Sequence, residues 1–294
     1  MINENEINEG LNYENVLKEH RINTSIEVPK PPTILSIREI GVSSVKERRL
    51  FTLCNFSTIK GKMKAKKTFL VSLLTSAIIK GNDYNDIFIG SLPENKKLTI
   101  YIDTEQGDWD SWNCIHRIEK MSGKKDNFLA FNLRAFTPGE RCDIIEFIFN
   151  KYKENIGLMI IDGVADLVMA LNDEIEATKV TSMLLKYTAM YNSHVSVVIH
   201  ENKMNEFATG HIGSSVMKKS EIIISVTKCK NIPDSSDVVC DYSRGYGFEP
   251  FVMTINEHGY PYVNKTKRQE VKDVPFYETE PEFPINNEFD NPPF

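Results

Sequence analysis

The chain has 294 residues, of which 41% are hydrophobic, 10% aromatic and 26% charged. This composition is typical of a globular protein and excludes wholesale disorder, a collagen-like fibre and a membrane bundle. No apolar run approaches the roughly 18 residues that span a bilayer, and the first ten residues are acidic, so we expect no membrane contact. Five scattered cysteines without metal-ligand spacing indicate a reducing, cytoplasmic compartment.

Charge is distributed unevenly along the chain. The net charge is −6, with −4 in residues 1–20 and −5 in residues 271–294, which leaves +3 for residues 21–270. A mildly basic core with acidic ends is compatible with binding a polyanion, although +3 over this length supports nucleic acid only weakly.

The predicted elements begin after an N-terminal arm and Pro-rich linker over residues 1–32. Apolar strands then alternate with helical patterns, which predicts an α/β domain over 33–268 with a mostly parallel sheet and helices on both faces. The expected strands are Leu50–Phe56, Leu98–Asp103, Phe128–Leu133, Leu158–Asp162, Val195–His200, Glu221–Thr227 and Phe251–Asn256. The expected helices are Thr68–Lys80, Trp109–Met121, Gly139–Tyr152 and Glu174–Tyr191. Residues 269–294 are expected to form a disordered, acidic, Pro-rich tail.

The first candidate site is a lysine-rich loop between an apolar strand and a helix. It fits the phosphate-loop pattern G-x-x-x-x-G-K-[ST] at Gly61, Lys67 and Thr68, with Lys66 where the second glycine belongs. In such loops backbone N–H groups hold the phosphates, the lysine contacts their β and γ oxygens, and the hydroxyl binds Mg²⁺. The alternative is a solvated basic run. The expected nucleotide-binding residues are Gly61, Lys62, Met63, Lys64, Ala65, Lys66, Lys67, Thr68 and Phe69.

Two later strands end in acids. The strand Leu158–Asp162 ends in a carboxylate that is placed to reach a Mg²⁺ ion held by Thr68, because open α/β sheets bind ligands at the carboxyl ends of their strands. The alternative is a buried strand that ends in Asp at a turn. Glu105, just beyond the strand Leu98–Asp103, is the candidate base that polarises the attacking water. Its alternative role is a helix-capping acid.

A third strand ends at His200 and is followed by the Gly/Ser-rich segment Gly210–Ser215. A polar residue in this position can sense the γ-phosphate, and a loop after it is free to move with that signal. The alternative is a structural histidine. Trp109 and Trp112, three residues apart on a predicted helix, are expected to pack in the core.

Taken together, these segments resemble the RecA-like P-loop ATPases, and within them the RepA/DnaB-type replicative ATPases of plasmids, phages and mobile elements. The likeness includes AAA-family ATPases of Bacteroides-type elements and covers about residues 50–260. The segments that carry it are Asn55–Phe69, Tyr101–Gln106, Ile160–Leu167, Gly210–Ser215 and Phe248–Phe251.

The resemblance implies a nucleotide at a subunit interface, ring or filament assembly, and DNA-contacting loops lining the centre. By that likeness His200 is the γ-phosphate sensor, and Met204–Ser215 is a DNA-facing loop. The residues implied to contact DNA are Lys203, His211, Lys218 and Lys219. The residues implied to reach a neighbour's nucleotide are Lys228, Lys230 and Arg244. Val164-Ala165 stands where relatives often carry an arginine, which disfavours DNA contact there.

These observations predict an ATP- and Mg²⁺-dependent, oligomeric ATPase that binds single-stranded DNA, a replicative helicase or helicase-like motor of a mobile element or phage. The predicted assembly is a ring, expected to be a hexamer, or a filament. One alternative is a RecA-type recombination or strand-annealing filament protein. Another is an ATPase-inactive scaffold that binds nucleotide or DNA.

The C-terminal segment Asn287–Phe294 resembles the acidic tip of bacterial single-stranded-DNA-binding proteins. That likeness implies docking to a replication protein, with Phe294 as an apolar anchor and nearby carboxylates steering it toward basic pockets. A solvating acidic tail is the alternative.

Overall fold

The computed structural model describes residues 13–40, 45–123, 126–201 and 209–264. The chain divides into two compact units, residues 1–31 and 32–294. The first contains the short helix α1 (Tyr13–Glu19), which has no buried residue within its own unit. Residues 1–12 of this arm lie outside the described residues.

The second unit is organised around a nine-stranded sheet of order β13-β12-β11-β10-β3-β9-β8-β6-β7. The six strands from β10 to β7 in this order run parallel, and β11 to β13 add an antiparallel edge. Their bounds are β3 (Phe56–Gly61), β6 (Leu98–Asp103), β7 (Phe128–Asn132), β8 (Ile156–Asp162), β9 (His194–His200), β10 (Ile222–Lys228), β11 (Ser235–Ser243), β12 (Phe251–Ile255) and β13 (Pro261–Val263). The predicted mostly parallel α/β sheet is thereby confirmed.

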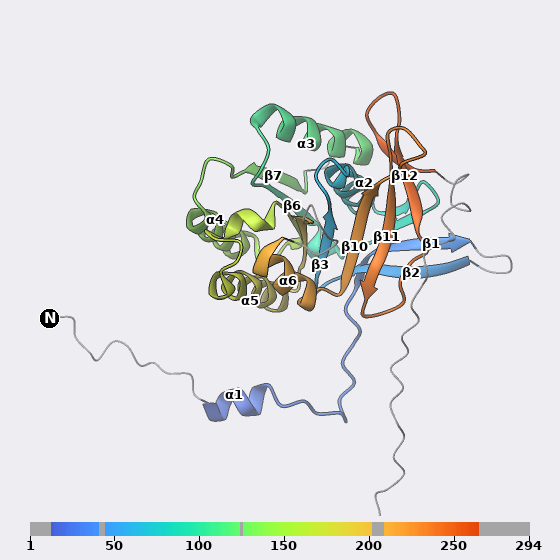
Figure 1. Cartoon of the computed structure of the whole chain (residues 1–294). Coiled ribbons are helices and arrows are strands. Elements are labelled where there is room, and N and C mark those ends of the chain that lie inside the picture. The colour runs from blue at the N-terminus through green and yellow to red at the C-terminus, as the bar shows by residue number, and fades with distance from the viewer. Residues whose placement is uncertain (1–12, 41–44, 124–125, 202–208, 265–294) are drawn as a thin grey trace, which may run out of the picture. The chain divides into compact units, whose positions relative to one another are not determined.

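Helices cover both faces of this sheet (Figure 1). One core joins α2 (Lys67–Lys80) and α3 (Asp108–Ser122) to sheet residues such as Tyr101 and Ile160. The other joins α4 (Pro138–Tyr152), α5 (Glu174–Tyr191) and α6 (Gly210–Lys219) to residues of the opposite parity, such as Ile102 and Ile161. Because side chains alternate along a strand, one apolar run supplies both cores.

A second sheet, of order β2-β1-β5-β4, flanks α2. Its antiparallel strands are β1 (Thr33–Ile40), β2 (Val45–Thr52), β4 (Asn82–Tyr84) and β5 (Phe88–Gly90). The expected strand Leu50–Phe56 is therefore wrong, because Leu50–Thr52 belong to β2 and only Phe56 begins β3. Between them Cys54 has a φ of 64°, a left-handed conformation that interrupts the strand.

Two 3₁₀ turns complete the described elements, η2 (Glu94–Lys96) and η3 (Val164–Leu167). All five cysteines are free thiols. Within the described ranges, no helix has the length and apolarity that crossing a membrane requires. The proposed tail, residues 269–294, lies outside those ranges.

Candidate nucleotide site

The lysine-rich loop connects β3 directly to α2. A Cβ atom on Gly61 would lie 2.3 Å from the carbonyl oxygen of Val226, so this glycine lets β3 pack against β10. The chain then passes through residues 62–66 and enters α2 at Lys67. The loop thus leads into a helix N-terminus, where backbone N–H groups and the helix dipole favour an anion.

Lys66 adopts the backbone conformation of the glycine that it replaces. Its φ and ψ are 68° and 31°, and it is the N-cap of α2. This left-handed conformation costs an L-residue about 1–2 kcal/mol relative to the right-handed region, whereas glycine adopts it freely. The departure from the phosphate-loop pattern therefore changes the side chain at this position but retains a glycine-like backbone conformation.

Lys67 points into the loop from the first turn of α2. Its Nζ donates to the carbonyl oxygen of Gly61 at 2.9 Å and lies 2.9 Å from Nδ1 of His200. Burial lowers the pKa of Lys67, and the carboxylates of Asp162 and Glu105 act against that shift. A buried ammonium in this position is suited to receive the negative charge of a phosphate.

His200 links Lys67 to Glu105. Its Nε2 lies 3.2 Å from each carboxylate oxygen of Glu105. Because Nδ1 accepts the hydrogen bond from the Lys67 ammonium, neutral His200 carries its proton on Nε2 and donates it to Glu105. That hydrogen bond lowers the pKa of Glu105 most, and electrostatic attraction from His200 and then from Lys67 lowers it further, so Glu105 stays ionised.

Glu105 does not cap a helix. The N-cap of α3 is Gly107, with no side-chain capping hydrogen bond. The backbone N–H groups of Glu105 and Gln106 instead donate to Oδ1 of buried Asp103 at 3.1 and 3.0 Å. Asp103, which the sequence does not single out as a site residue, therefore fixes the turn that directs Glu105 toward His200.

Thr68 and Asp162 meet as the sequence predicts for a magnesium pair. The Thr68 hydroxyl donates to Oδ2 of Asp162 at 3.1 Å, and the hydroxyl of buried Tyr101 donates to the same oxygen at 2.7 Å. Burial raises the pKa of Asp162 to about 6, with the Tyr101 hydrogen bond opposing the shift. Tyr101 was not identified from the sequence, since a tyrosine within an apolar strand gives no signal beyond core packing.

The predicted site residues whose side chains are described above line one cleft of about 550 Å³. Its lining residues are Lys64, Lys66, Lys67, Thr68, Phe69, Glu105, Gln106, Trp109, Asp110, Asn113, Arg117, Asp162 and His200. The expectation that Trp109 and Trp112 pack in the core is wrong, because they are 72% and 58% exposed. Both lie on the outer side of α3, whose buried side is supplied by smaller residues such as Cys114 and Ile118.

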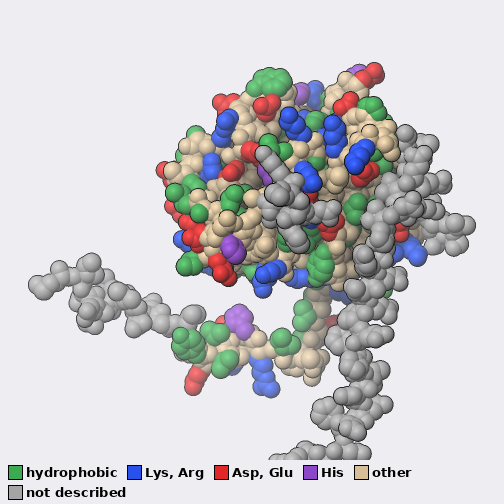
Figure 2. All heavy atoms as spheres, viewed as in Figure 1, with side chains coloured by type: hydrophobic (Ala, Val, Ile, Leu, Met, Phe, Trp, Pro, Cys, Tyr) green, Lys and Arg blue, Asp and Glu red, His purple; other side chains and the backbone are tan. Residues whose placement is uncertain are grey.

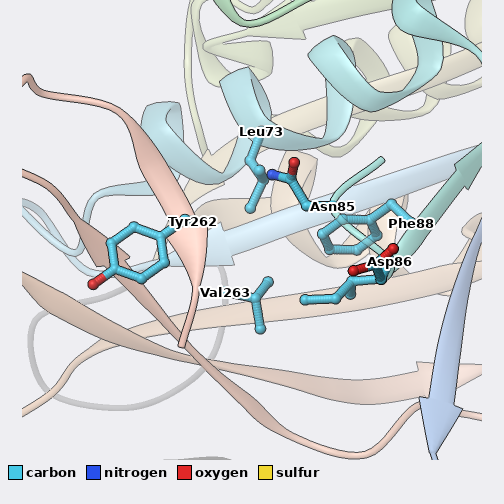
Figure 3. Close-up of a pocket in the computed structure, with 7 residues that line it drawn as sticks. Leu73, Asn85, Asp86, Phe88, Tyr262 and Val263 are labelled. Atoms are coloured by element: carbon cyan, nitrogen blue, oxygen red, sulfur yellow. The ribbon is translucent and has the colours of Figure 1, made fainter. Parts of the chain in front are cut away.

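A second cavity of about 360 Å³ lies between α2, the β4–β5 turn and β13 (Figure 3). Leu73, Phe88 and Val263 contribute apolar walls, and Asp86 is its charged residue. With no lysine or arginine in its lining, this cavity offers no counter-charge for a phosphate. The cleft at the phosphate loop is the better candidate for an anionic ligand.

The donor set at the cleft fits Mg²⁺ and a nucleotide. Mg²⁺ is held in proteins by one or two oxygen side chains together with substrate phosphates and water, and Thr68 and Asp162 supply such oxygens. Among the described residues, no group of three or more His, Cys, Asp or Glu side chains forms a metal site of its own.

Of the residues implied to contact DNA, the three that the structure describes do not form one cluster. His211 is exposed in the first turn of α6, whereas Lys218 and Lys219 are exposed in its last turn. Lys203 and the rest of residues 202–208 lie outside the described ranges. Basic and acidic side chains are interspersed on the described part of the face shown in Figure 2.

The three residues implied to act on a neighbour's nucleotide lie at two opposite edges of the sheet. Lys228 ends β10 beside the phosphate-loop edge, and Lys230 follows it. Arg244 follows β11 at the opposite edge, where its guanidinium donates to the carbonyl oxygen of Lys219 at 3.0 Å. Its backbone N–H donates to the carbonyl oxygen of Glu221, the residue before β10. Arg244 therefore cannot reach its own chain's cleft, while action on a neighbouring chain stays a prediction.

Comparison with known proteins gives partial relatives. RadB of Methanococcus maripaludis strain C7, a DNA repair and recombination protein, is 36% identical over 129 residues, or 40% of this chain and 55% of that protein. RadB from another M. maripaludis source is 40% identical over 98 residues, and that of strain C5 is 34% identical over 116 residues. The chain spans about half the length of these curated relatives: 55%, 42% and 50%.

No protein-family model matches the chain. The partial likeness to RadB nevertheless agrees with the parallel sheet, the glycine-like phosphate loop and the acidic strand ends described above. Together these observations support one structural assignment: the chain has a RecA-like P-loop core.

Proposed function

We propose that this protein is an ATP- and Mg²⁺-dependent, DNA-binding ATPase of the RecA type that acts in recombination or repair. The observation that carries the proposal is the convergence of Thr68–Asp162 and Lys67–His200–Glu105 at the carboxyl ends of adjacent parallel strands. The likeness to RadB supports the recombination class over the helicase that the sequence predicts.

In this proposal each side chain has a defined task. Lys67 and the loop N–H groups hold the phosphates, and Thr68 and Asp162 hold the metal. Bound Mg²⁺ would supply charge neutralisation at the phosphate oxygens. Ionised Glu105 accepts a proton from water, and His200, hydrogen-bonded to both Glu105 and Lys67, couples that base to the phosphate-binding lysine.

The DNA and assembly parts of the proposal rest on the resemblance. We assign single-stranded DNA contact to the region that carries Lys203, His211, Lys218 and Lys219, and action in trans to Lys228, Lys230 and Arg244. An N-terminal arm and a docking tail at residues 269–294 remain part of this proposal. Removing Pro292–Phe294 is expected to weaken recruitment of a replication partner without changing ATP hydrolysis.

The decisive test is phosphate release by purified protein with and without single-stranded DNA, compared with Lys67→Ala. DNA-stimulated release that the variant abolishes is expected. If the wild type released no more phosphate than Lys67→Ala, the protein would instead be an inactive scaffold that binds nucleotide or DNA. Negative-stain images with DNA and ATP then distinguish the two active classes, because open helical filaments support a recombination protein and closed rings a helicase-like motor.

A further inference from the structure

Lys66 makes an ion pair outside its own loop. Its Nζ lies 2.9 Å from Oδ1 of Asp234, in the connection between β10 and β11. The Lys66 side chain is 17% exposed and the Asp234 side chain 76% exposed. Lys66 also lines the nucleotide cleft, so a single ammonium borders both Asp234 and the space beside the phosphate loop.

The start of β11, directly after this connection, is also attached to the phosphate loop. The Ser236 hydroxyl donates to the carbonyl oxygen of Ala65 at 2.9 Å. The backbone carbonyl of Asp234 is held by the N–H of Ile255 on β12 at 3.0 Å. The Asp234 backbone is thus anchored independently of its side chain, and the carboxylate can release Lys66 while the strand pairing stays intact.

Charge explains why Lys66 needs a partner. Lys64 and Lys67 line the same cleft, and the charge of Lys228 also acts on Asp234. Like charges this close repel one another, and Asp234 offsets part of that repulsion. A polyphosphate in the cleft would offer the same ammonium a stronger, multiply charged acceptor.

We propose that Lys66 is a further phosphate-binding residue and that Asp234 is a positioning residue that competes with nucleotide phosphate for the Lys66 ammonium. The proposal rests on nucleotide binding as proposed above. It implies that nucleotide removes the Lys66–Asp234 attachment between the phosphate loop and residues 229–234, while the Ser236 hydrogen bond still joins β11 to the loop.

A double-mutant cycle tests the competition. Asp234→Asn keeps the shape of the side chain and tolerates the φ of 52° at this position, and Lys66→Met keeps the aliphatic stem without the charge. Since an exposed ion pair is weak, Asp234→Asn is expected to tighten ATP binding about two- to fivefold. Lys66→Met should weaken it, and Asp234→Asn should then have no effect in the Lys66→Met background. Binding is measured by displacement of a fluorescent nucleotide in Mg²⁺.

The matched control is Asp83→Asn, which removes a carboxylate paired with Arg38 in the small sheet. Equal tightening by this control, or tightening by Asp234→Asn that persists with Lys66→Met, would reduce the effect to general electrostatics and overturn the competition. Wild-type protein that binds no nucleotide at all would instead refute the proposed function, so the two failures are distinguishable.

The reactivity of the Cys229 thiol tests whether residues 229–234 are released from the phosphate loop. It is half-buried, and its alkylation can be followed peptide by peptide with mass spectrometry. We expect MgATP to accelerate this alkylation in the wild type, and Asp234→Asn to accelerate it without nucleotide. A rate that neither change affects would show that residues 229–234 stay attached, and the release would be disproved.

Discussion

The Lys67 ammonium lies 2.9 Å from Nδ1 of His200, joining the carboxyl ends of the neighbouring parallel strands β3 and β9. Gly61, whose carbonyl oxygen accepts a hydrogen bond from Nζ of Lys67, pairs with His200 in that register. The candidate phosphate-binding lysine and the residue that contacts the candidate base are therefore joined by a hydrogen bond.

Lys67→Ala is expected to lower kcat/KM for ATP hydrolysis by about 100-fold or more, because it removes the charge that faces the β- and γ-phosphates. Lys66→Gly is expected to retain kcat but to raise KM for ATP, because it removes the Lys66 ammonium. It should also remove a backbone strain of about 1 kcal/mol, offset in part by loss of the Asp234 ion pair. Phosphate release and thermal unfolding measure the two effects. An active Lys67→Ala with an inactive Lys66→Gly would show that the loop assignment is shifted.

Glu105→Gln is expected to bind ATP with near wild-type affinity and to hydrolyse it at least about 100-fold more slowly, since the amide cannot accept the water proton. It should accumulate the ATP-bound assembly. Nucleotide displacement and single-turnover hydrolysis separate the two steps. Equal losses of affinity and rate would assign Glu105 a structural role through its hydrogen bond to His200.

Arg244→Ala is expected to abolish turnover in the assembled protein without weakening ATP binding by the dilute chain, because Arg244 lies at the sheet edge opposite its own cleft. Mixing Arg244→Ala with Lys67→Ala should restore part of the activity, since each variant supplies the group that the other lacks. A mixture as inactive as its components, or full activity of Arg244→Ala alone, would remove the assignment in trans.

We predict that the stability of the protein depends on pH because the carboxyl group of Glu221 is largely buried. Burial raises its pKa to about 7, although Thr52 donates to both carboxylate oxygens and Arg49 and Arg244 lie nearby. A raised acid pKa means that the folded state binds the extra proton, so its contribution to stability falls as pH rises from about 4.5 to 7. His194, beside it, has a pKa lowered by burial to about 4 and stays neutral over most of that range.

Glu221→Gln removes this titration. The free energy of unfolding of the variant relative to the wild type should therefore increase between pH 5 and pH 8, by at most about 3 kcal/mol. Urea unfolding at the two pH values measures the change, and Glu249→Gln, on an exposed side chain, is the control. A difference that is independent of pH would show that Glu221 is ionised throughout.

Lys218→Gln with Lys219→Gln is expected to weaken single-stranded DNA binding and to reduce the slope of log K against log salt by about 1.4, which is about 0.7 for each of two lysines that neutralise one phosphate. The matched control is Lys151→Gln with Lys153→Gln, two exposed lysines at the end of α4. Fluorescence anisotropy at several salt concentrations measures both. Identical slopes for the two double variants would place the DNA elsewhere.

From β6 to β9 the sequence by itself determined how strands and helices alternate, and which polar residues stand at the strand ends. Glu174–Tyr191 was predicted to the residue, and the predicted site residues Lys67, Thr68, Glu105, Asp162 and His200 all line one cleft. This was possible because buried parallel strands are nearly continuous apolar runs, and because the polar residue that ends each run stands out against it. Parallel topology then brings those ends to one edge.

Only the tertiary structure decided which side chains meet across distant segments. The Lys66–Asp234 pair spans 168 positions, and the Tyr101–Asp162 hydrogen bond spans 61. Periodicity did not place Trp109 on the outside of α3, because amphipathic spacing shows that residues share a face without showing which face is covered. Contacts of this kind depend on strand order and register, which arise from the packing of the whole domain and leave no trace in any short stretch of sequence.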